Sequence, residues 1–87
     1  MVTRIAGLEY MEISKDLVLS EGDHLMLEYE QDNPYDRNAV KVLKGGTQIG
    51  YLPKEVSASL SSADERKAIV EEILESESYT KILIKIE

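Results

Sequence analysis

The sequence predicts a small, mainly β domain: a closed or partly open barrel of five to six short strands with one or two short helices. The chain has 87 residues, enough for one domain around one modest core. Short stretches in which apolar and polar residues alternate recur along it, with turn signals between them. Glycines stand at the bends. Residues 1–87 are therefore predicted to form a single domain, either a protein by itself or part of a longer one.

The first predicted strand covers residues 2–10, which are rich in apolar and β-branched side chains, with Gly7 marking a kink or bulge. Residues 20–23, Ser-Glu-Gly-Asp, are typical of a turn. In residues 25–29, leucine and tyrosine alternate with methionine and glutamate, the period of a half-buried strand. Asn33-Pro34 ends this strand, because proline lacks a backbone donor and restricts the residue before it.

A hairpin and a helix are predicted next. Residues 39–43 form one strand, Gly45-Gly46 the turn, and residues 48–52 the return strand. Pro53 suits the first position of a helix, because its missing N–H has no partner there in any case. A short helix over residues 54–60 is therefore expected to follow the hairpin directly.

The last third of the chain allows two interpretations. Residues 62–65, Ser-Ala-Asp-Glu, fit a capping box, and the apolar spacing that follows fits a helix. Residues 68–74 fit a bulged strand equally well, with Glu77-Ser78 as the turn after it. Residues 79–86 are predicted as a strand, because every second residue from Ile82 to Ile86 is isoleucine. Whether residues 63–75 are helix or strand stays open from the sequence alone.

The composition excludes several kinds of chemistry. The chain has no cysteine and one histidine, His24, so it offers neither disulfides nor a thiolate or zinc constellation. Its serines lack a partner base, and no catalytic set is found, which predicts a non-enzyme without cofactor or metal. The N-terminal residues MVTRIAGLEY contain no long apolar run, so neither a signal peptide nor a membrane span is predicted. The absence of cysteine fits a reducing cytoplasm, the predicted location.

The charge is strongly negative overall but uneven. The formal net charge is -7 and the pI is near 4.7, which argues against binding nucleic acid through a broad basic surface. Residues 33–54 differ, since they hold four basic residues against the single acid Asp36. The four are Arg37, Lys41, Lys44 and Lys54. This window permits a local contact with nucleic acid without requiring one.

The turn that begins residues 33–53, NPYDRNAVKVLKGGTQIGYLP, is the strongest candidate for a binding site. It carries Asn33, Tyr35, Asp36 and Asn38, more hydrogen-bonding chemistry than a chain reversal needs. Loops of this kind on a rigid scaffold commonly carry function. Asparagine and aspartate also favour turns for purely local reasons. The residue types by themselves therefore leave both a structural turn and a binding site open.

The blocks NPYDRNAVKV and IGYLPKEVSASL, preceded by IAGLEY at residues 5–10, resemble the HIRAN domain. That family occurs at the N-terminus of some helicase-like DNA-repair translocases and as stand-alone bacterial proteins. The resemblance covers most of the chain up to Leu60. It implies an OB-like or Greek-key β-barrel that captures the 3′-hydroxyl end of single-stranded DNA, in DNA repair and replication-fork processing.

The resemblance also implies roles for individual residues. Tyr10 and Tyr35 look like the aromatic pair that stacks on the terminal base. Asp36 looks like the residue that accepts a hydrogen bond from the 3′-hydroxyl. Asn33 looks like a further contact near the terminal nucleotide, and Lys54 like the cation that meets a phosphate.

Three further positions follow from the same resemblance. Tyr79 is similar to a second aromatic residue that packs on the end nucleotides, and Tyr51 stands where DNA-binding members have a histidine. Glu9 stands where those members have a basic residue. Together with the net charge of -7, Glu9 supports an alternative: a protein-interaction or regulatory module of the same fold that has lost DNA binding. The expected partner is a single-stranded DNA 3′ end or a DNA-processing protein, with no membrane, and the oligomeric state stays undetermined.

Overall fold

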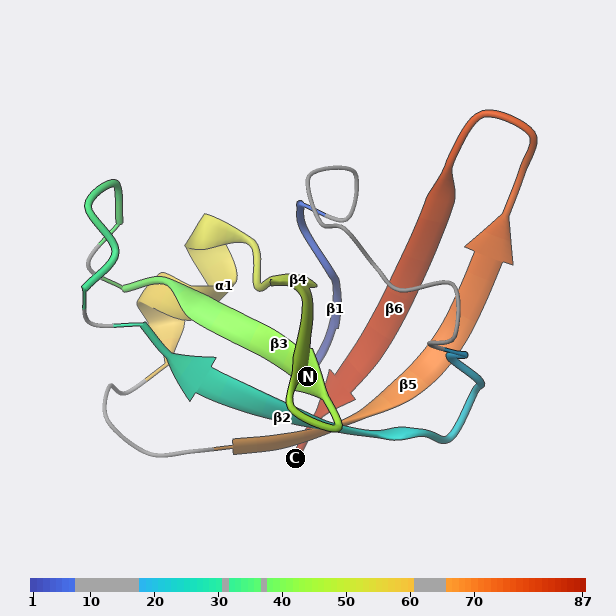
Figure 1. Ribbon diagram of the computed structural model, residues 1–87, viewed down its shortest axis with the longest axis horizontal. Helices are drawn as coiled ribbons and strands as arrows, with labels where there is room; N and C mark the ends of the chain where they lie inside the picture. Colours follow the sequence, from blue (N-terminus) through green and yellow to red (C-terminus); the bar gives the residue numbers. More distant parts are fainter. Residues whose placement is uncertain (8–17, 31, 37, 61–65) are drawn as a thin grey trace.

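The computed structural model describes residues 1–7, 18–30, 32–36, 38–60 and 66–87. These residues contain six strands and one short helix (Figure 1). In chain order they are β1 (Val2–Arg4), β2 (His24–Tyr29), β3 (Val40–Lys44), β4 (Thr47–Tyr51), α1 (Lys54–Ser59), β5 (Arg66–Glu75) and β6 (Thr80–Ile86). The mainly β fold class predicted from the sequence is confirmed.

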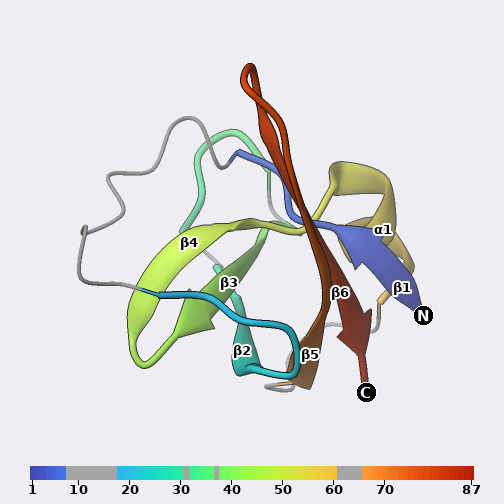
Figure 2. The same cartoon turned by 90° about the vertical axis from the view of Figure 1, so that its right-hand side faces the viewer.

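All six strands belong to one antiparallel sheet with the order β1-β6-β5-β2-β3-β4. Strands β2, β3 and β4 follow one another as a meander, whereas β1 pairs with β6 and β2 pairs with β5 across long sequence separations. The sheet curls strongly, so that its two edges approach each other (Figure 2). The result is the partly open barrel that the succession of short strands predicts.

A single bridge joins the two edges of the sheet. The N–H of Ala6 donates to the carbonyl of Tyr51 at 2.7 Å, and the N–H of Tyr51 donates back at 2.9 Å. The preceding residue, Ile5, donates to the carbonyl of Ile82 in β6 at 3.0 Å. Gly50 allows this approach, because a Cβ there would lie 2.5 Å from Cγ2 of Ile5 and 2.7 Å from the carbonyl oxygen of Ala6. The closure therefore lies next to Tyr51.

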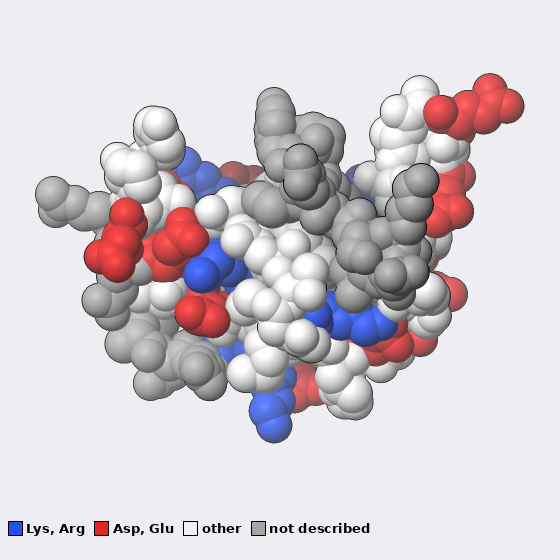
Figure 3. Space-filling model, in the orientation of Figure 1, with Lys and Arg blue, Asp and Glu red and all other residues white. Residues whose placement is uncertain are grey.

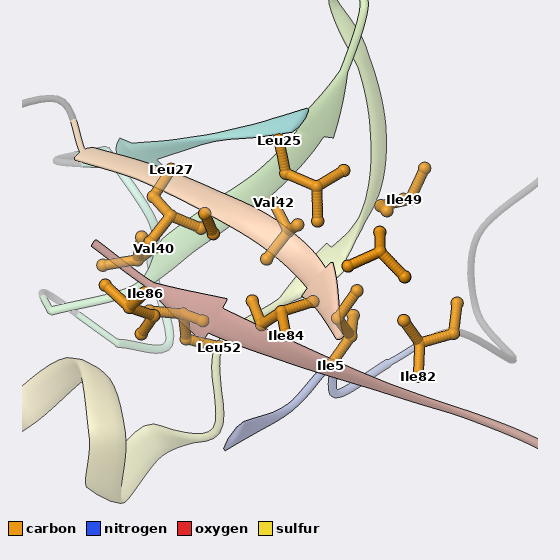
Figure 4. Packing of buried hydrophobic residues seen from close by; sticks show 12 residues of the cluster. Ile5, Leu25, Leu27, Val40, Val42, Ile49, Leu52, Ile82, Ile84 and Ile86 are labelled. Atoms are coloured by element: carbon orange, nitrogen blue, oxygen red, sulfur yellow. The ribbon is translucent and has the colours of Figure 1, made fainter. Parts of the chain in front are cut away.

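The core lies inside the curl, and the period-two patterns of the sequence supply it. Leu25 and Leu27 are buried while their neighbours Met26 and Glu28 are exposed, as a half-buried strand requires. Side chains from β2, β3, β4, β5 and β6 meet in one cluster (Figure 4). Its members are Ile5, Leu25, Leu27, Val40, Val42, Ile49, Leu52, Ala68, Val70, Ile82, Ile84 and Ile86.

The structure settles the ambiguous segment in favour of a strand. Residues of β5 pair with β2 on one side and β6 on the other, and the register shifts between Val70 and Glu72, as in a β-bulge. Ala68 and Val70 are buried between the two partners, so the helical interpretation is wrong for residues 66–75. The turn after β5 is closed by the N–H of Ser76, which donates to the carbonyl of Tyr79 at 2.9 Å. The predicted capping box at residues 62–65 lies outside the described residues.

Two predicted boundaries differ from the structure. The predicted strand over residues 2–10 is realised as β1 plus the bridge at Ala6, followed by Gly7 with a φ of 74°, and residues 8–10 lie outside the described part. Pro53 is the N-cap residue, not the first helical residue, with a ψ of 146°. Its carbonyl accepts from the N–H of Ser57 at 3.0 Å, which is the role of an N-cap carbonyl.

Candidate nucleic-acid interface

The predicted turn lies between the end of β2 and the start of β3. Because β3 is antiparallel to both β2 and β4, β2 and β4 run in the same direction, and the end of β4 and the start of α1 lie at this same end of the sheet (Figure 1). The N–H of Leu52 donates to the carbonyl of Val40 at 3.0 Å. The chain entering α1 therefore runs beside the chain leaving the turn.

Asn33 organises the turn with its side-chain amide. Its Oδ1 accepts from the N–H groups of Tyr35 at 2.8 Å and Asp36 at 2.9 Å. Its Nδ2 donates to Oε1 of Glu30 at 2.7 Å. Asparagine used in this way mimics a backbone turn, so the described contacts of Asn33 hold the loop that carries the candidate site.

Tyr35 and Asp36 are the two groups that this turn presents. The side chain of Tyr35 stands out into solvent, since the residue is 92% exposed. Asp36 is half-buried, and its Oδ1 accepts from the N–H of Asn38 at 2.9 Å. Its second carboxylate oxygen has no hydrogen-bond donor among the residues that the structure describes. An exposed ring is therefore followed in sequence by a carboxylate with one oxygen that no described donor reaches, on a turn whose backbone Asn33 holds.

Glu30 is a residue of this region that the sequence reasoning missed. Its Oε1 accepts from Nδ2 of Asn33 and also from the hydroxyl of Tyr51 at 3.0 Å, while its Oε2 lies 3.6 Å from Nζ of Lys41. The ring of Tyr51 passes close to Gly7, where a Cβ would lie 3.8 Å from Cδ2 of the ring. Tyr51 is therefore half-buried with its hydroxyl held by a carboxylate. The alternating pattern of β2, which exposes Glu28 and continues one residue past the end of the strand to Glu30, was the signal that could have located Glu30.

Two of the four basic residues in the window 33–54 are paired with acids. Nζ of Lys41 lies 3.6 Å from Glu30 and 3.9 Å from Glu28. Nζ of Lys44 lies 2.7 Å from Oδ2 of Asp23. This hydrogen bond from Lys44, with a second from the backbone N–H of Ser20, lowers the pKa of the Asp23 carboxyl. The positive charge of these two lysines is thus compensated by acids outside the window.

Among the described basic residues of the window 33–54, Lys54 is the one that is exposed. It begins α1 and has no ion-pair partner among the described residues, whereas Arg37 lies outside them. On the face seen in Figure 3, acidic side chains surround a basic one on the side that carries the turn, and others stand at the end of the β5–β6 hairpin. A phosphate that approaches the turn on this face would therefore meet mixed, mainly acidic surroundings.

The predicted site residues are brought together in part. Asn33, Tyr35, Asp36, Tyr51 and Lys54 all lie at the end of the sheet described above. Tyr79 does not join them, since it stands in the turn of the β5–β6 hairpin, at the opposite end of the long axis (Figure 1), and is 63% exposed. Tyr10 and Glu9 lie outside the described residues.

The described residues contain no group of three or more His, Cys, Asp or Glu side chains suited to a metal ion. They also contain no helix of the length and apolarity that a bilayer crossing demands.

Comparison with known proteins gives consistent matches. A family model for the HIRAN domain matches residues 1–87. The helicase-like transcription factor of Oryctolagus cuniculus is 41% identical over 51 residues, or 58% of this chain and 5% of that protein. The Fanconi-associated nuclease 1 homolog of Arabidopsis thaliana is 40% identical over 60 residues, or 68% of this chain and 6% of that protein. The chain thus spans only about a twentieth of the length of these relatives.

A solved structure shares the fold. The crystal structure of the HIRAN domain of human HLTF superposes with a TM-score of 0.66 at 22% sequence identity. The match covers 99% of this chain and 73% of the other. The curled six-stranded sheet with its single short helix is therefore the fold of that domain.

Proposed function

This chain belongs to the HIRAN family, and from that premise we propose that it is a DNA-binding module, not an enzyme, that captures the 3′-hydroxyl end of single-stranded DNA. The observation that carries the proposal is the turn after β2. It carries the exposed ring of Tyr35 and, at the next residue, the Asp36 carboxylate, and Asn33 holds the backbone of both residues. Relatives of the chain lie within a helicase-like transcription factor and a nuclease homologue, which supports a role in DNA repair or replication-fork processing.

The chemistry of capture follows from these groups. The terminal base stacks on Tyr35, with Tyr10 as the second aromatic of the pair, and stacking of this kind is worth about 1 to 3 kcal/mol per base regardless of sequence. The Asp36 carboxylate accepts a hydrogen bond from the 3′-hydroxyl through its second oxygen. The same carboxylate repels a 3′-phosphate. Lys54 contacts the phosphate next to the terminal nucleotide, and Tyr79 packs on nucleotides farther from the 3′ end.

The acidity of the domain is compatible with such a mode. A site that neutralises only one or two phosphates needs little positive charge. The net charge of -7 also repels the backbone of an internal segment, so that a free end, with its hydroxyl and terminal base, is favoured over the middle of a strand.

Fluorescence anisotropy with short oligonucleotides tests this function. Oligonucleotides that end in a 3′-hydroxyl should bind, those that end in a 3′-phosphate should bind more weakly, and a circular single strand should not compete. Equal affinity for the two ends, or no binding at low salt, would contradict the proposal.

A second candidate function is a protein-interaction or regulatory module of the same fold. The ion pairs of Lys41 and Lys44 favour it, because they leave little positive charge for a nucleic acid. This function predicts a protein partner that is recovered from native lysate after nuclease treatment, together with no measurable binding of oligonucleotides.

A further inference from the structure

We propose that Glu30 is a positioning residue for the end-binding site. Its carboxylate holds the turn that presents Tyr35 and Asp36, and it fastens that turn to β4. The part of the inference that concerns DNA rests on the proposed function. The part that concerns the geometry of the turn stands on the contacts of Glu30 in the protein alone.

The first contact fixes the orientation of Asn33. Oε1 of Glu30 accepts from Nδ2 of Asn33 at 2.7 Å, a short bond of the charge-assisted kind. With Nδ2 held there, Oδ1 of Asn33 faces the N–H groups of Tyr35 and Asp36. A flipped amide would direct NH₂ hydrogens at these two donors and its oxygen at a carboxylate. The carboxylate thus selects the one amide orientation that forms the turn.

The second contact fastens the turn to the sheet. The same Oε1 accepts from the hydroxyl of Tyr51 at 3.0 Å. The backbone of Tyr51 forms the bridge to Ala6 that joins the sheet edges. Glu30 therefore connects the turn after β2 with the strand that closes the curled sheet, and its side chain is only 24% exposed.

Glu28, near the end of β2, provides a matched comparison for Glu30, which directly follows that strand. It lies two residues earlier, on the outer face of β2, and its Oε1 is 3.9 Å from Nζ of Lys41. Its side chain is 51% exposed, and it makes no hydrogen bond to the turn among the described residues. Replacing Glu28 removes the same charge beside the same lysine but leaves the contacts of Asn33 and Tyr51 intact.

The binding test compares three variants with the wild-type protein by anisotropy, using 3′-hydroxyl and 3′-phosphate oligonucleotides. Glu30→Ala should weaken binding of the hydroxyl end by roughly tenfold or more, as expected for loss of hydrogen bonds to a charged group, and should reduce the preference for hydroxyl over phosphate. Glu30→Gln keeps an accepting oxygen and should restore affinity and preference to within about threefold of wild type. Glu28→Ala should behave as wild type.

A second readout needs no DNA. In NMR spectra of the free protein, Glu30→Ala should shift the side-chain amide of Asn33 and the backbone amides of Tyr35 and Asp36, while Glu28→Ala should leave them in place. If these shifts occur and the wild-type protein binds no oligonucleotide, the proposed function fails but the positioning role stands.

Several results would overturn the inference. One is a folded Glu30→Ala protein with wild-type turn shifts, and another is Glu30→Gln behaving like Glu30→Ala, which would assign the effect to charge alone. Should Glu30→Ala fail to fold, Tyr51→Phe removes only the hydroxyl contact. It should still shift the amide of Asn33, and an unchanged spectrum would contradict the coupling.

Discussion

Within the turn after β2, some polar side chains hold the backbone of the loop and others face the solvent. Asn33 turns its amide inward, where every described hydrogen bond it makes holds the loop. Tyr35, two residues later, turns its ring outward and is 92% exposed. Asp36 combines both purposes, since one oxygen accepts from the N–H of Asn38 and the other accepts from no donor in the part of the chain that the structure describes. Substitutions at these positions should therefore separate stability from binding.

Tyr35→Ala should leave stability nearly unchanged, within about 0.5 kcal/mol, because an exposed side chain loses little on truncation. It should cost about 1 to 3 kcal/mol of affinity for a 3′-hydroxyl end, the value of one stacked base. Urea denaturation and anisotropy measure the two quantities. Tyr79→Ala is the control and is measured with a dinucleotide, because a ligand so short that is bound at the turn cannot also reach the β5–β6 hairpin. Equal losses of affinity in Tyr35→Ala and Tyr79→Ala would contradict the assignment of Tyr35 as the stacking residue.

Asp36→Asn keeps an oxygen that can accept from the N–H of Asn38 but removes the negative charge. We expect a folded protein of similar stability in which the preference for a 3′-hydroxyl over a 3′-phosphate is largely lost, because the repulsion of phosphate disappears. Paired anisotropy titrations measure this ratio. A variant that keeps the full preference would show that Asp36 has only a structural role.

At the scale of elements, the bridge between Ala6 and Tyr51 makes an open sheet into a nearly closed one. It depends on Gly50, whose missing Cβ leaves room for Ile5 and the backbone of Ala6. The hydroxyl of Tyr51 in turn reaches Glu30, so closure of the sheet and the geometry of the turn are linked through one residue of β4.

Gly50→Ala should therefore destabilise the protein by about 1 to 3 kcal/mol, the usual cost of overpacking. Hydrogen exchange should show lost protection at the amides of Ala6 and Tyr51. Gly46→Ala is the control, since nothing lies within 4 Å of a Cβ there and only its φ of 84° opposes the change. The control should lose some stability but keep both amides protected. An unaltered exchange pattern in Gly50→Ala would contradict this account of closure.

At the scale of the whole molecule, two lysines of this acidic domain are paired with carboxylates. Lys41 and Lys44 both face carboxylates on neighbouring parts of the sheet. The lysines thus contribute to the cohesion of a protein with a net charge of -7, and they contribute little to the attraction of an anionic ligand. These ion pairs should therefore affect the stability of the protein in acid and the salt dependence of DNA binding.

Stability should fall in acid partly through Asp23. The hydrogen bonds from Lys44 and from the backbone of Ser20 hold the pKa of Asp23 below its ordinary value of 3.8. A carboxyl whose pKa is lower in the folded state stabilises the protein at pH values above the unfolded pKa, and this contribution disappears as pH falls through the folded pKa. Asp23→Asn should accordingly be less stable than wild type at pH 7. The difference in free energy of unfolding between the two proteins should become smaller below about pH 4. Chemical denaturation across this range measures the difference, and a difference independent of pH would contradict the assignment.

The salt dependence of DNA binding should be shallow. A site that meets one or two phosphates predicts a slope of log affinity against log salt of roughly -1, far from the slope near -10 of proteins with many phosphate contacts. Anisotropy titrations from low to moderate salt measure it. A steep slope would indicate a broad basic surface, which the described ion pairs of Lys41 and Lys44 oppose.

The local properties of the chain were readable from its sequence. Alternation in β2 and β6 determines which side chains enter the core, because successive residues of any strand point to opposite faces. The Gly45-Gly46 turn and the short helix after Pro53 likewise follow from local backbone preferences. The turn chemistry of Asn33 and Asp36 was visible for the same reason.

Tertiary structure decided what depends on partners distant in sequence. Residues 66–75 became a strand because β2 and β6 offer edges on both sides, and pairing overrides weak local preference. Glu30 can link the turn to β4 only because the pairing of the strands brings the hydroxyl of Tyr51, 21 residues along the chain, within hydrogen-bond distance of its carboxylate. The same register pairs Lys41 with acids, and the length of the β5–β6 hairpin carries Tyr79 away from the turn. Periodicity within a strand is set by the covalent chain, whereas the neighbours of an outward-facing side chain are set only when the strands have paired.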